Sequence, residues 1–388
     1  MHGRGPLQTV TRAVFHFNIR AMQGVYMSNK ISVGILGATG MVGQNYINLL
    51  KNHPWFEITY LAASPASAGK KYSKAVEGRW LMQEDIPEQV KNLIVHDANS
   101  IEQAKGNCSL VFSAVDMDKK AVAAMESAYA GAGFAVLSNN SAHRFTPDVP
   151  MIIPEINASH ADIIPVQQKN HEWTKGFIAV KSNCSIQSYM TPVFSLIEAG
   201  YAVRKMFITT LQALSGAGYP GPSALDMIDN VIPFIKGEEE KSEQEPLKIL
   251  GRIENGKIVN ANAPLITAHC NRVPVIHGHT ACVSLEFDGE KPELQEIISV
   301  WQNFKSVPQQ LKLPSAPQNA IVYRSEENRP QPRKDLDSGN GMTVTVGRLR
   351  PDNIFDIRFV GLHHNTIRGA AGGCILTAEL LKAKGFIE

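Results

Sequence analysis

The chain has 388 residues, which is enough for two domains that each enclose a core of their own. Its 44% hydrophobic and 19% charged residues are typical of a soluble α/β protein, and its formal net charge of +2 argues against nucleic acid or an acidic membrane surface as a partner. No apolar run approaches the length of a membrane span, and five scattered cysteines exclude a disulfide framework and favour a reducing compartment.

Residues 1–30 differ from the rest of the chain because they contain arginines but no acidic residue. This composition resembles an organellar transit peptide, although serine is scarce. The favoured interpretation is that Met27 is the natural start and that the preceding residues are an unstructured extension. Cytoplasmic location is therefore expected, with organellar targeting by residues 1–26 as the alternative.

Residues 31–155 are expected to form a dinucleotide-binding domain. Ile31, Val33 and Ile35 alternate as in a strand, and the apolar residues after Met41 recur at helical spacing. The sequence GATGMVG between them, Gly37 to Gly43, is a G-x-x-G-x-x-G turn. A strand before it and a helix after it aim the helix N-terminus at a pyrophosphate. A tight turn without a ligand is the alternative.

The next strand, from Ile58, ends in SPASAGKK, where an NAD-specific protein usually carries an acidic residue for the ribose hydroxyls. Ser64 and Ser67 stand there instead, followed by Lys70 and Lys71. Hydroxyls without an acid favour a 2′-phosphate and hence NADP, whereas the lysines fit a solvated turn equally well. Residues 110–115 and 135–140 predict further buried parallel strands around a helical segment, so the domain is expected to be a doubly wound sheet.

Residues 156–361 are expected to form an α+β catalytic and dimerisation domain with a mainly antiparallel sheet. Residues 280–287, 341–350 and 354–361 alternate by twos, and turn residues join the last two segments. Residues 362–388 predict a glycine-opened helix that returns to the cofactor domain.

Cys184 follows Ser182 and Asn183 and precedes a segment with apolar residues at helical spacing. A lone cysteine is usually a small buried hydrophobe. If Ser182 or Asn183 caps a helix, however, Cys184 lies in the first turn, where the helix dipole favours a thiolate. Cys184 is therefore a candidate nucleophile.

Two further segments carry candidate binding groups. Gln212 is expected at a strand end before flexible glycines, where an amide could hold a carbonyl or carboxylate. Arg272 and His279 are seven residues apart, so Pro274 and Gly278 must bend the chain if both side chains are to face one site. His279 alone would more often be a structural residue than a base.

Glu238 and Lys241 lie one helical turn apart in GEEEK, which by default indicates a solvated charged face. Arg144 follows the strand that closes the first sheet. Its guanidinium could grip phosphate or carboxylate with two hydrogen bonds, although a surface arginine is the commoner outcome.

Together these motifs resemble aspartate-β-semialdehyde dehydrogenase, in particular its archaeal and fungal branch. The resemblance covers the chain from Ile31 to the C-terminus and rests on GATGMVG, SNNSAHR with DVPMIIPEIN, SNCS, LQALSGAGYPG, GEEEK, NRVPVIHGHT and NTIRGAAGG in the family's order. It implies a Cys184 nucleophile, His279 as general acid/base and Gln212 orienting the carbonyl. It also implies substrate contacts from Arg272 to the carboxylate, Glu238 to the ammonium group, Arg144 and Lys241 to phosphate, and from Asn183. The implied NADP contacts are Gly37, Thr39, Gly40, Met41, Val42, Gly43, Ser64, Ser67 and Asn365.

The implied reaction is the reversible, NADPH-dependent reductive dephosphorylation of β-aspartyl phosphate to aspartate β-semialdehyde through a Cys184 thioester. It serves lysine, threonine, methionine and isoleucine biosynthesis, needs no metal, and is carried out by a homodimer or homotetramer. Ala66 stands where many relatives carry a basic residue, so relaxed use of NAD is consistent with the sequence. The rival hypotheses are an acyl-phosphate or acyl-CoA reductase, such as one acting on malonyl-CoA, and an inactive NADP-binding regulatory protein.

Overall fold

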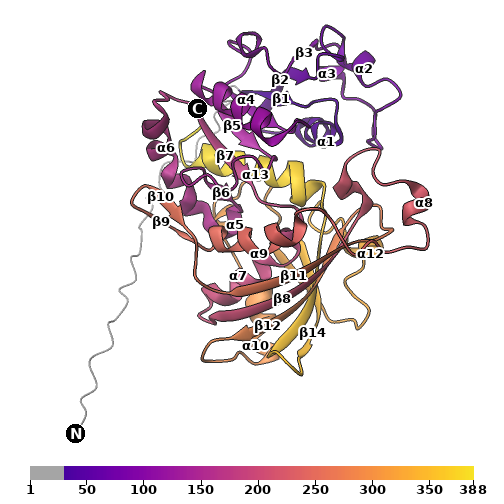
Figure 1. Cartoon of the computed structure of the whole chain (residues 1–388), viewed down its shortest axis with the longest axis vertical. Coiled ribbons are helices and arrows are strands. Elements are labelled where there is room, and N and C mark those ends of the chain that lie inside the picture. The colour runs from indigo at the N-terminus through magenta and orange to yellow at the C-terminus, as the bar shows by residue number, and fades with distance from the viewer. Residues whose placement is uncertain (1–29) are drawn as a thin grey trace.

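The computed structural model describes residues 30–388, so the predicted extension falls almost entirely outside the described residues. Two sheets stand one above the other in Figure 1, with the N-terminal half of the chain at the top and the long strands of the second half at the bottom. The C-terminal helix α13 (Gly372–Ala383) lies in the upper half.

The first sheet has seven strands, and every neighbouring pair is parallel, as the alternation of strand and helix patterns predicted. In spatial order the strands are β3 (Val95–Asp97), β2 (Phe56–Ala63), β1 (Ile31–Leu36), β4 (Leu110–Ser113), β5 (Ala135–Ser138), β7 (Phe177–Lys181) and β6 (Met151–Ile152). The sheet therefore extends past residue 155, where the sequence suggested a change of domain, and it includes the strand that leads to Cys184.

The second sheet has six strands in the order β11 (Leu265–Arg272), β8 (Val203–Gln212), β12 (His279–Phe287), β15 (Ile357–His363), β14 (Val344–Pro351) and β13 (Ile321–Arg324). The three central pairs are antiparallel, as expected, whereas β11 pairs with β8 and β13 with β14 in parallel. The sheet is therefore mixed. Its register places Arg272 opposite Gln212, and His279 opposite His363.

Helices with recognisable end signals connect and cover these sheets. Asp118 caps α4 by accepting hydrogen bonds from the backbone of Lys120 and Ala121, and Glu293 and Glu296 form a capping box on α10. The helices are α1 (Met41–Leu50), α2 (Tyr72–Ala75), α3 (Glu88–Lys91), α4 (Lys119–Gly131), α5 (Pro154–Asn157), α6 (Ile164–His171), α7 (Met190–Glu198), α8 (Ala224–Met227), α9 (Glu238–Ile249), α10 (Leu294–Asn303), α11 (Val307–Gln310), α12 (Pro332–Asp335) and α13. A small hairpin consists of β9 (Arg252–Glu254) and β10 (Lys257–Val259).

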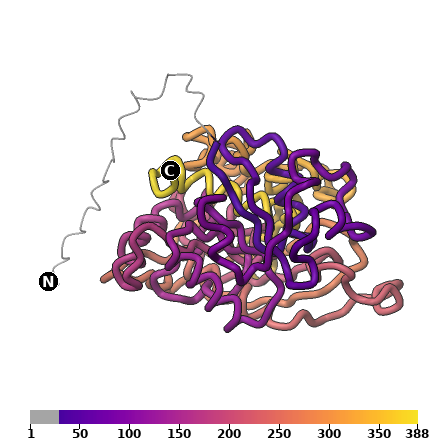
Figure 2. The backbone as a smooth tube through the Cα atoms, turned by 90° about the horizontal axis from the view of Figure 1, so that it is seen from above, coloured from indigo at the N-terminus to yellow at the C-terminus, as the bar shows by residue number. Residues whose placement is uncertain are grey.

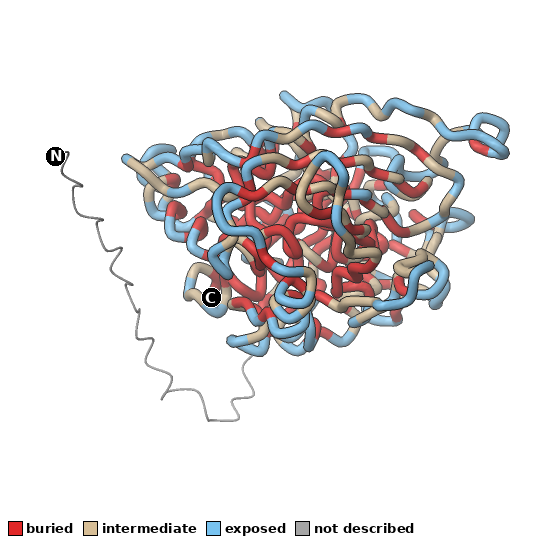
Figure 3. Tube along the Cα trace, turned by 90° about the horizontal axis from the view of Figure 1, so that it is seen from below, coloured by how far each residue is buried: buried red, intermediate tan, exposed pale blue. Residues whose placement is uncertain are grey.

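Two apolar clusters hold the layers together. One surrounds α1 and α13 on one side of the first sheet and includes Tyr46 and Leu380; the other runs from the first sheet through α7 to the second sheet and ends around Trp301. Figure 3 shows the buried residues gathered in the middle of the molecule and exposed residues at its periphery.

The segment around α8 protrudes from the body, as Figure 2 also shows at the lower right. Within residues 30–388, every helix is too short or too polar to cross a bilayer.

The C-terminal segment departs from the predicted single helix. Residues 367–371 form a π-helical turn in which Ala370 has non-helical dihedral angles, and α13 begins only at Gly372. From there α13 packs against α1 and against β5 and β7 of the first sheet.

Candidate active site

The glycine turn after β1 has the geometry that a dinucleotide needs. Gly37 has φ of +84°, which favours glycine, and a Cβ on Gly43 would overlap the carbonyl of Gly37. Gly40 occupies the N-cap of α1 without a side-chain cap, so the first amides of this ten-residue helix stay available to an anion. The residues present therefore fit a pyrophosphate at this edge of the sheet.

The end of β2 carries the predicted hydroxyls and lysines next to this turn. Ser64 is exposed and directly follows the strand, whereas Ser67 is buried. Lys70 and Lys71 are both exposed, and the ammonium group of Lys70 donates to the carbonyl of Ala66 at 2.9 Å. Positive charge and an exposed hydroxyl thus stand where a 2′-phosphate would be recognised, and no acidic side chain interrupts residues 64–71.

Cys184 lies just beyond the C-terminal end of β7, at the same edge of the first sheet. Its Sγ is 3.5 Å from Nε2 of His279. The expected helix does not begin here: residues 185–188 form a single 3₁₀ turn, and α7 starts only at Met190. Asn183 accepts hydrogen bonds from the backbone and hydroxyl of Ser185, which orders this turn.

The environment of Cys184 also corrects the expectation of a thiol acidified by a helix dipole. Burial raises the pKa of the Cys184 thiol, and the carboxylate of Glu238 raises it further. The cations of Lys181, Arg144 and Lys241 act in the opposite direction. Burial and Glu238 therefore favour the neutral thiol, whereas the three neighbouring cations favour the thiolate.

His279, the first residue of β12, is fully buried. Its Nδ1 accepts a hydrogen bond of 3.0 Å from the backbone N–H of Ala213. Burial lowers the pKa of His279 to about 3, and the neighbouring Arg272 cation contributes to the shift. The imidazole of His279 is therefore neutral at physiological pH.

Arg272 and His279 face one site, as the bend between them was expected to allow. Gly278 has φ of +101° just before β12, and Arg272 ends β11 beside Gln212. Arg272 is buried and donates to the carbonyl of Ala213 at 2.7 Å. A Cβ built on Gly216 would lie 2.9 Å from Nη1 of Arg272 and 3.0 Å from Nε2 of His279. The loop of residues 213–221, which contains Gly216 and is called the glycine loop below, therefore lies directly against both side chains.

Glu238 is buried in the site, so the default interpretation of GEEEK as a solvated face is wrong for this residue. Its carboxylate accepts hydrogen bonds from Asn183 at 2.8 Å, Gln212 at 3.1 Å and Lys241 at 2.8 Å. These polar contacts, with Lys241 first, keep the pKa of Glu238 below its ordinary value although burial opposes this. The ionised carboxylate of Glu238 thus joins three other predicted site residues.

Arg144 is also buried, which excludes the interpretation as a surface arginine. Its guanidinium donates to Glu245 at 2.8 Å and to the carbonyl of Asn139 at 3.1 Å. Glu245 also accepts a hydrogen bond from the backbone of Asn183. Arg144 is therefore fixed next to the turn that carries Cys184.

The side chain of Asn365 is hydrogen-bonded through both its oxygen and its nitrogen. Its side-chain oxygen accepts from the backbone of Gly278 at 2.8 Å, and its amide donates to Ser215 at 2.8 Å. Asn365 thereby connects the loop before His279 with the glycine loop.

Sequence reasoning missed three buried residues around Cys184: Lys181, Glu245 and His363. Lys181 ends an otherwise apolar strand. A charged residue at that position could have indicated a functional site. Glu245 follows Glu238 by seven residues, two turns along the same face of α9. His363 is recognisable only from the sheet register, which pairs it with His279.

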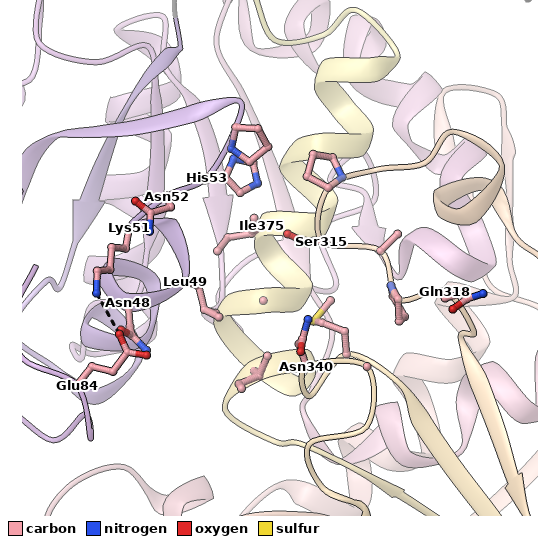
Figure 4. A pocket seen from close by; sticks show the side chains of 18 residues that line it. Asn48, Leu49, Lys51, Asn52, His53, Glu84, Ser315, Gln318, Asn340 and Ile375 are labelled. Carbon is pink, nitrogen blue, oxygen red and sulfur yellow. Dashed lines mark hydrogen bonds and ion pairs between the residues drawn. The ribbon is translucent and has the colours of Figure 1, made fainter.

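One cavity of about 650 Å³ lies apart from these groups, between the end of α1, residues 314–318 and the start of α13 (Figure 4). Lys51 and Glu84 form an ion pair of 3.2 Å at its edge. None of the predicted catalytic, substrate or cofactor residues lines it.

Over residues 30–388, no group of three or more histidine, cysteine or acidic side chains is arranged to hold a metal ion.

The cluster has a defined chemical capacity. A half-buried thiol, a neutral imidazole and several fixed cations lie close together, which suits nucleophilic attack on a carbonyl of an anionic substrate. The anion-binding turn after β1 stands at the same edge of the same sheet as Cys184. A dinucleotide held there could therefore act on a group bound to the sulfur.

Comparisons with known proteins agree with this arrangement. Residues 32–164 match the family model described as semialdehyde dehydrogenase, NAD binding domain, and residues 193–368 match semialdehyde dehydrogenase, dimerisation domain. An aspartate-semialdehyde dehydrogenase from Archaeoglobus fulgidus is 45% identical over 91% of this chain and 98% of the relative. A relative of the same name from Cryptococcus neoformans is 42% identical over 92% of this chain and 99% of the relative.

Solved structures give the same result. The crystal structure of aspartate semialdehyde dehydrogenase with NADP from Candida albicans matches with a TM-score of 0.83 and 39% identity, covering 92% of this chain and all of that chain. Aspartate semialdehyde dehydrogenase II from Vibrio cholerae matches with a TM-score of 0.71 at 22% identity, over 92% of this chain and 99% of that one, which establishes a shared fold.

Proposed function

The chain belongs to the aspartate-semialdehyde dehydrogenase family, and on that premise we propose that it converts β-aspartyl phosphate to aspartate β-semialdehyde and phosphate, reversibly and with NADPH. The reaction belongs to amino-acid biosynthesis from aspartate. The observation that carries the proposal is the contact of 3.5 Å between Sγ of Cys184 and Nε2 of His279, at the edge of the sheet that holds the glycine turn.

Cys184 is the nucleophile. Its sulfur attacks the carbonyl carbon of β-aspartyl phosphate, the bond from that carbon to the phosphate oxygen breaks, and a thioester forms on the enzyme as phosphate leaves. A nicotinamide cofactor held at the turn from Gly37 to Gly43 would supply the hydride that reduces this thioester. The resulting thiohemiacetal oxygen re-forms a carbonyl as the carbon–sulfur bond breaks, which releases the aldehyde and returns Cys184. Lys181, Arg144 and Lys241 support these steps because their charges favour the ionised sulfur.

Substrate recognition follows from the fixed charges around the sulfur. Arg272 is proposed to grip the substrate carboxylate, and Glu238 its ammonium group. Arg144 and Lys241 are proposed to attract the phosphate, with Lys241 the more exposed of the two cations. Gln212 and Asn183 are proposed to orient the carbonyl and the cysteine turn; both already donate to Glu238.

The cofactor is NADP, with its pyrophosphate on the amides after Gly37 and its 2′-phosphate near Ser64. The contacts proposed for it remain Gly37, Thr39, Gly40, Met41, Val42, Gly43, Ser64, Ser67 and Asn365. The uncapped start of α1 and the acid-free turn after β2 support this assignment. Ala66 supplies no charge there, so partial use of NAD is part of the proposal.

The protein forms a homo-oligomer, because residues 193–368 match a dimerisation domain. We propose a dimer or a dimer of dimers built through the second sheet. Leu265 on β11 is 66% exposed and Ile276 is 70% exposed, so apolar surface remains available on this half of one chain.

A cytoplasmic location is proposed because all five cysteines are free thiols.

An assay with aspartate semialdehyde, phosphate and NADP tests the function in the oxidative direction. NADPH formation should require all three and should not respond to coenzyme A. Turnover that depends on coenzyme A and not on phosphate would instead support the acyl-CoA reductase. NADP binding without turnover of either kind would support the inactive regulatory protein.

A further inference from the structure

The cavity of about 650 Å³ shown in Figure 4 is lined by segments from both halves of the chain. The end of α1 lies on one side of it, residues 314–318 lie on the other, and the start of α13 lies between them. Small-molecule sites in proteins typically measure about 300–1,000 Å³. The cavity therefore has the size of a ligand site, although no residue assigned to the reaction lines it.

A buried hydrogen-bond network fixes the walls of this cavity. Nδ1 of His53 accepts hydrogen bonds from two backbone N–H groups, so the ring hydrogen lies on Nε2, which is 2.8 Å from Oε1 of Glu379. Glu379 also accepts a hydrogen bond of 3.0 Å from the backbone N–H of Ser315. These contacts join α13 to the end of α1 and to residues 314–318. The cavity is therefore already formed in the folded chain.

Lys51 and Glu84 bring one positive and one negative charge to the edge of the cavity, where they form an ion pair of 3.2 Å. Their side chains are 40% and 61% exposed, so the pair contributes little to stability and can separate at small cost. A phosphate ester would find a single lysine that a carboxylate already neutralises. A ligand with both an ammonium and a carboxylate group can pair with both side chains and leaves no charge unpaired. The pair therefore favours a zwitterion.

Asn48 lies beside this ion pair in the cavity wall (Figure 4). Its side-chain oxygen is buried and has no hydrogen-bond partner among the described residues. An unpaired buried oxygen costs free energy, which a nearby donor would recover. Rotation of the amide exchanges the positions of its oxygen and nitrogen, so this oxygen can be offered to a donor in the cavity. An ammonium group next to Glu84 is such a donor.

Much of the remaining wall is apolar. An aliphatic group on the ligand would be removed from water there, which is favourable in proportion to the area buried. The apolar lining residues include Leu49, Pro54, Ala316, Met342, Ile367 and Ile375.

We propose that this cavity is a second ligand site, which binds an α-amino acid with an aliphatic side chain. The ammonium group of the ligand pairs with Glu84, its carboxylate pairs with Lys51, and its side chain packs against Ile367 and Ile375. Binding at this site does not depend on the proposed function.

Residues 367–375 connect the cavity to Cys184. Ile367 and Ile375 line the cavity, whereas a Cβ built on Gly369 would lie only 3.1 Å from Cβ of Cys184. The same short segment therefore has one side against the cavity and the other against the cysteine. A ligand packed on the two isoleucines stabilises the segment in this position. Access to the sulfur should fall when the cavity is occupied.

Calorimetric titration of the full chain with L-isoleucine and L-methionine tests the site without reference to activity. Both amino acids should bind. The amine 2-methylbutylamine and the acid 3-methylpentanoate each lack one charged group of L-isoleucine, so each should bind at least about tenfold more weakly. Equal affinity for the amino acid and either analogue would overturn the inference. No detectable binding of L-isoleucine or L-methionine up to about 10 mM would also overturn it.

The substrate site is also proposed to recognise an ammonium and a carboxylate group, so variants must separate the two sites. Lys51→Met should weaken L-isoleucine binding about tenfold, whereas Arg272→Lys should leave it unchanged. Lys74→Met is the matched control, because it removes an exposed ion pair with Glu77, 2.9 Å long, outside the cavity. It should bind as the wild type does. Binding that is lost in Arg272→Lys and kept in Lys51→Met would place the amino acid in the substrate site, and the inference would fail.

Alkylation of Cys184 by iodoacetamide, followed by the mass of its peptide, tests the connection to the cysteine. Saturating L-isoleucine should slow this reaction about fivefold or more in the wild type and in Arg272→Lys, but not at the same concentration in Lys51→Met. An unchanged rate in wild-type protein with L-isoleucine bound would refute the connection. A wild-type protein that binds L-isoleucine but has no aspartate semialdehyde activity would refute the proposed function and leave this site established.

Discussion

Replacing Gly216 with alanine should damage catalysis without destabilising the fold. A Cβ on this residue would lie 2.8 Å from Cε1 of His279 and 2.9 Å from Nη1 of Arg272. Comfortable contacts between carbon atoms begin at about 3.5 Å, so the imidazole or the loop must shift by at least about half an ångström. Because a misplacement of about 1 Å costs about 10²-fold in rate, we expect kcat/KM to fall about 10- to 100-fold, equivalent to about 1.4–2.7 kcal/mol.

The assay is NADPH formation from aspartate semialdehyde and phosphate, with thermal unfolding measured on the same samples. Gly216 is exposed and its φ is not positive, so alanine should leave the thermal midpoint unchanged or slightly higher. Gly131→Ala is the matched control, because the added Cβ would meet Trp173 at an ordinary 3.4 Å at the end of α4. If Gly216→Ala stays within twofold of the wild-type kcat/KM, the loop does not lie against His279 and Arg272 in the working enzyme.

Three further outcomes are expected. Cys184→Ser should fold and bind NADP but lose nearly all turnover, because an alkoxide forms far less readily than a thiolate; substantial activity would remove Cys184 from the nucleophile's role. Arg272→Lys should raise the KM for aspartate semialdehyde and leave NADP binding intact, since a point charge cannot grip a carboxylate with two parallel bonds; an unchanged KM would argue against this contact. Urea unfolding should show stability falling as pH drops from about 6.5 toward 4, because the folded pKa values of His279, about 3, and His364, about 4, lie below the unfolded value, so the unfolded chain binds more protons. His364→Gln should weaken this dependence, and a flat profile in the wild type would contradict the burial of both rings.

Local patterns were sufficient to predict the elements and several positions of the site. The glycine turn follows a strand and precedes a helix, Gln212 ends β8, and the chain bends at Gly278 between Arg272 and His279. Each of these features depends on residues that are close in sequence, where periodicity and backbone preferences act.

The electrostatics of the site could not be predicted in this way. Glu238 is buried because Asn183 and Gln212, from two other parts of the chain, close over it, and a charged helix face gives no sign of that. The pKa of Cys184 likewise depends on burial by elements far along the sequence, which outweighs the contribution expected from its own short turn. The neutral state of His279 has the same origin.

The position of β7 determines which groups of the site are carried by the same sheet. Cys184 follows a strand of the same sheet that carries the glycine turn, whereas Gln212, Arg272 and His279 belong to strands of the other sheet. A rigid rotation of one sheet against the other would therefore preserve the distance between the sulfur and a bound dinucleotide. The same rotation would change the contact between Cys184 and His279, so opening the molecule would remove the imidazole from the sulfur while leaving the hydride donor in place. One sheet therefore fixes the nucleophile relative to the cofactor-binding turn, and the other sheet fixes the side chains that act on the substrate.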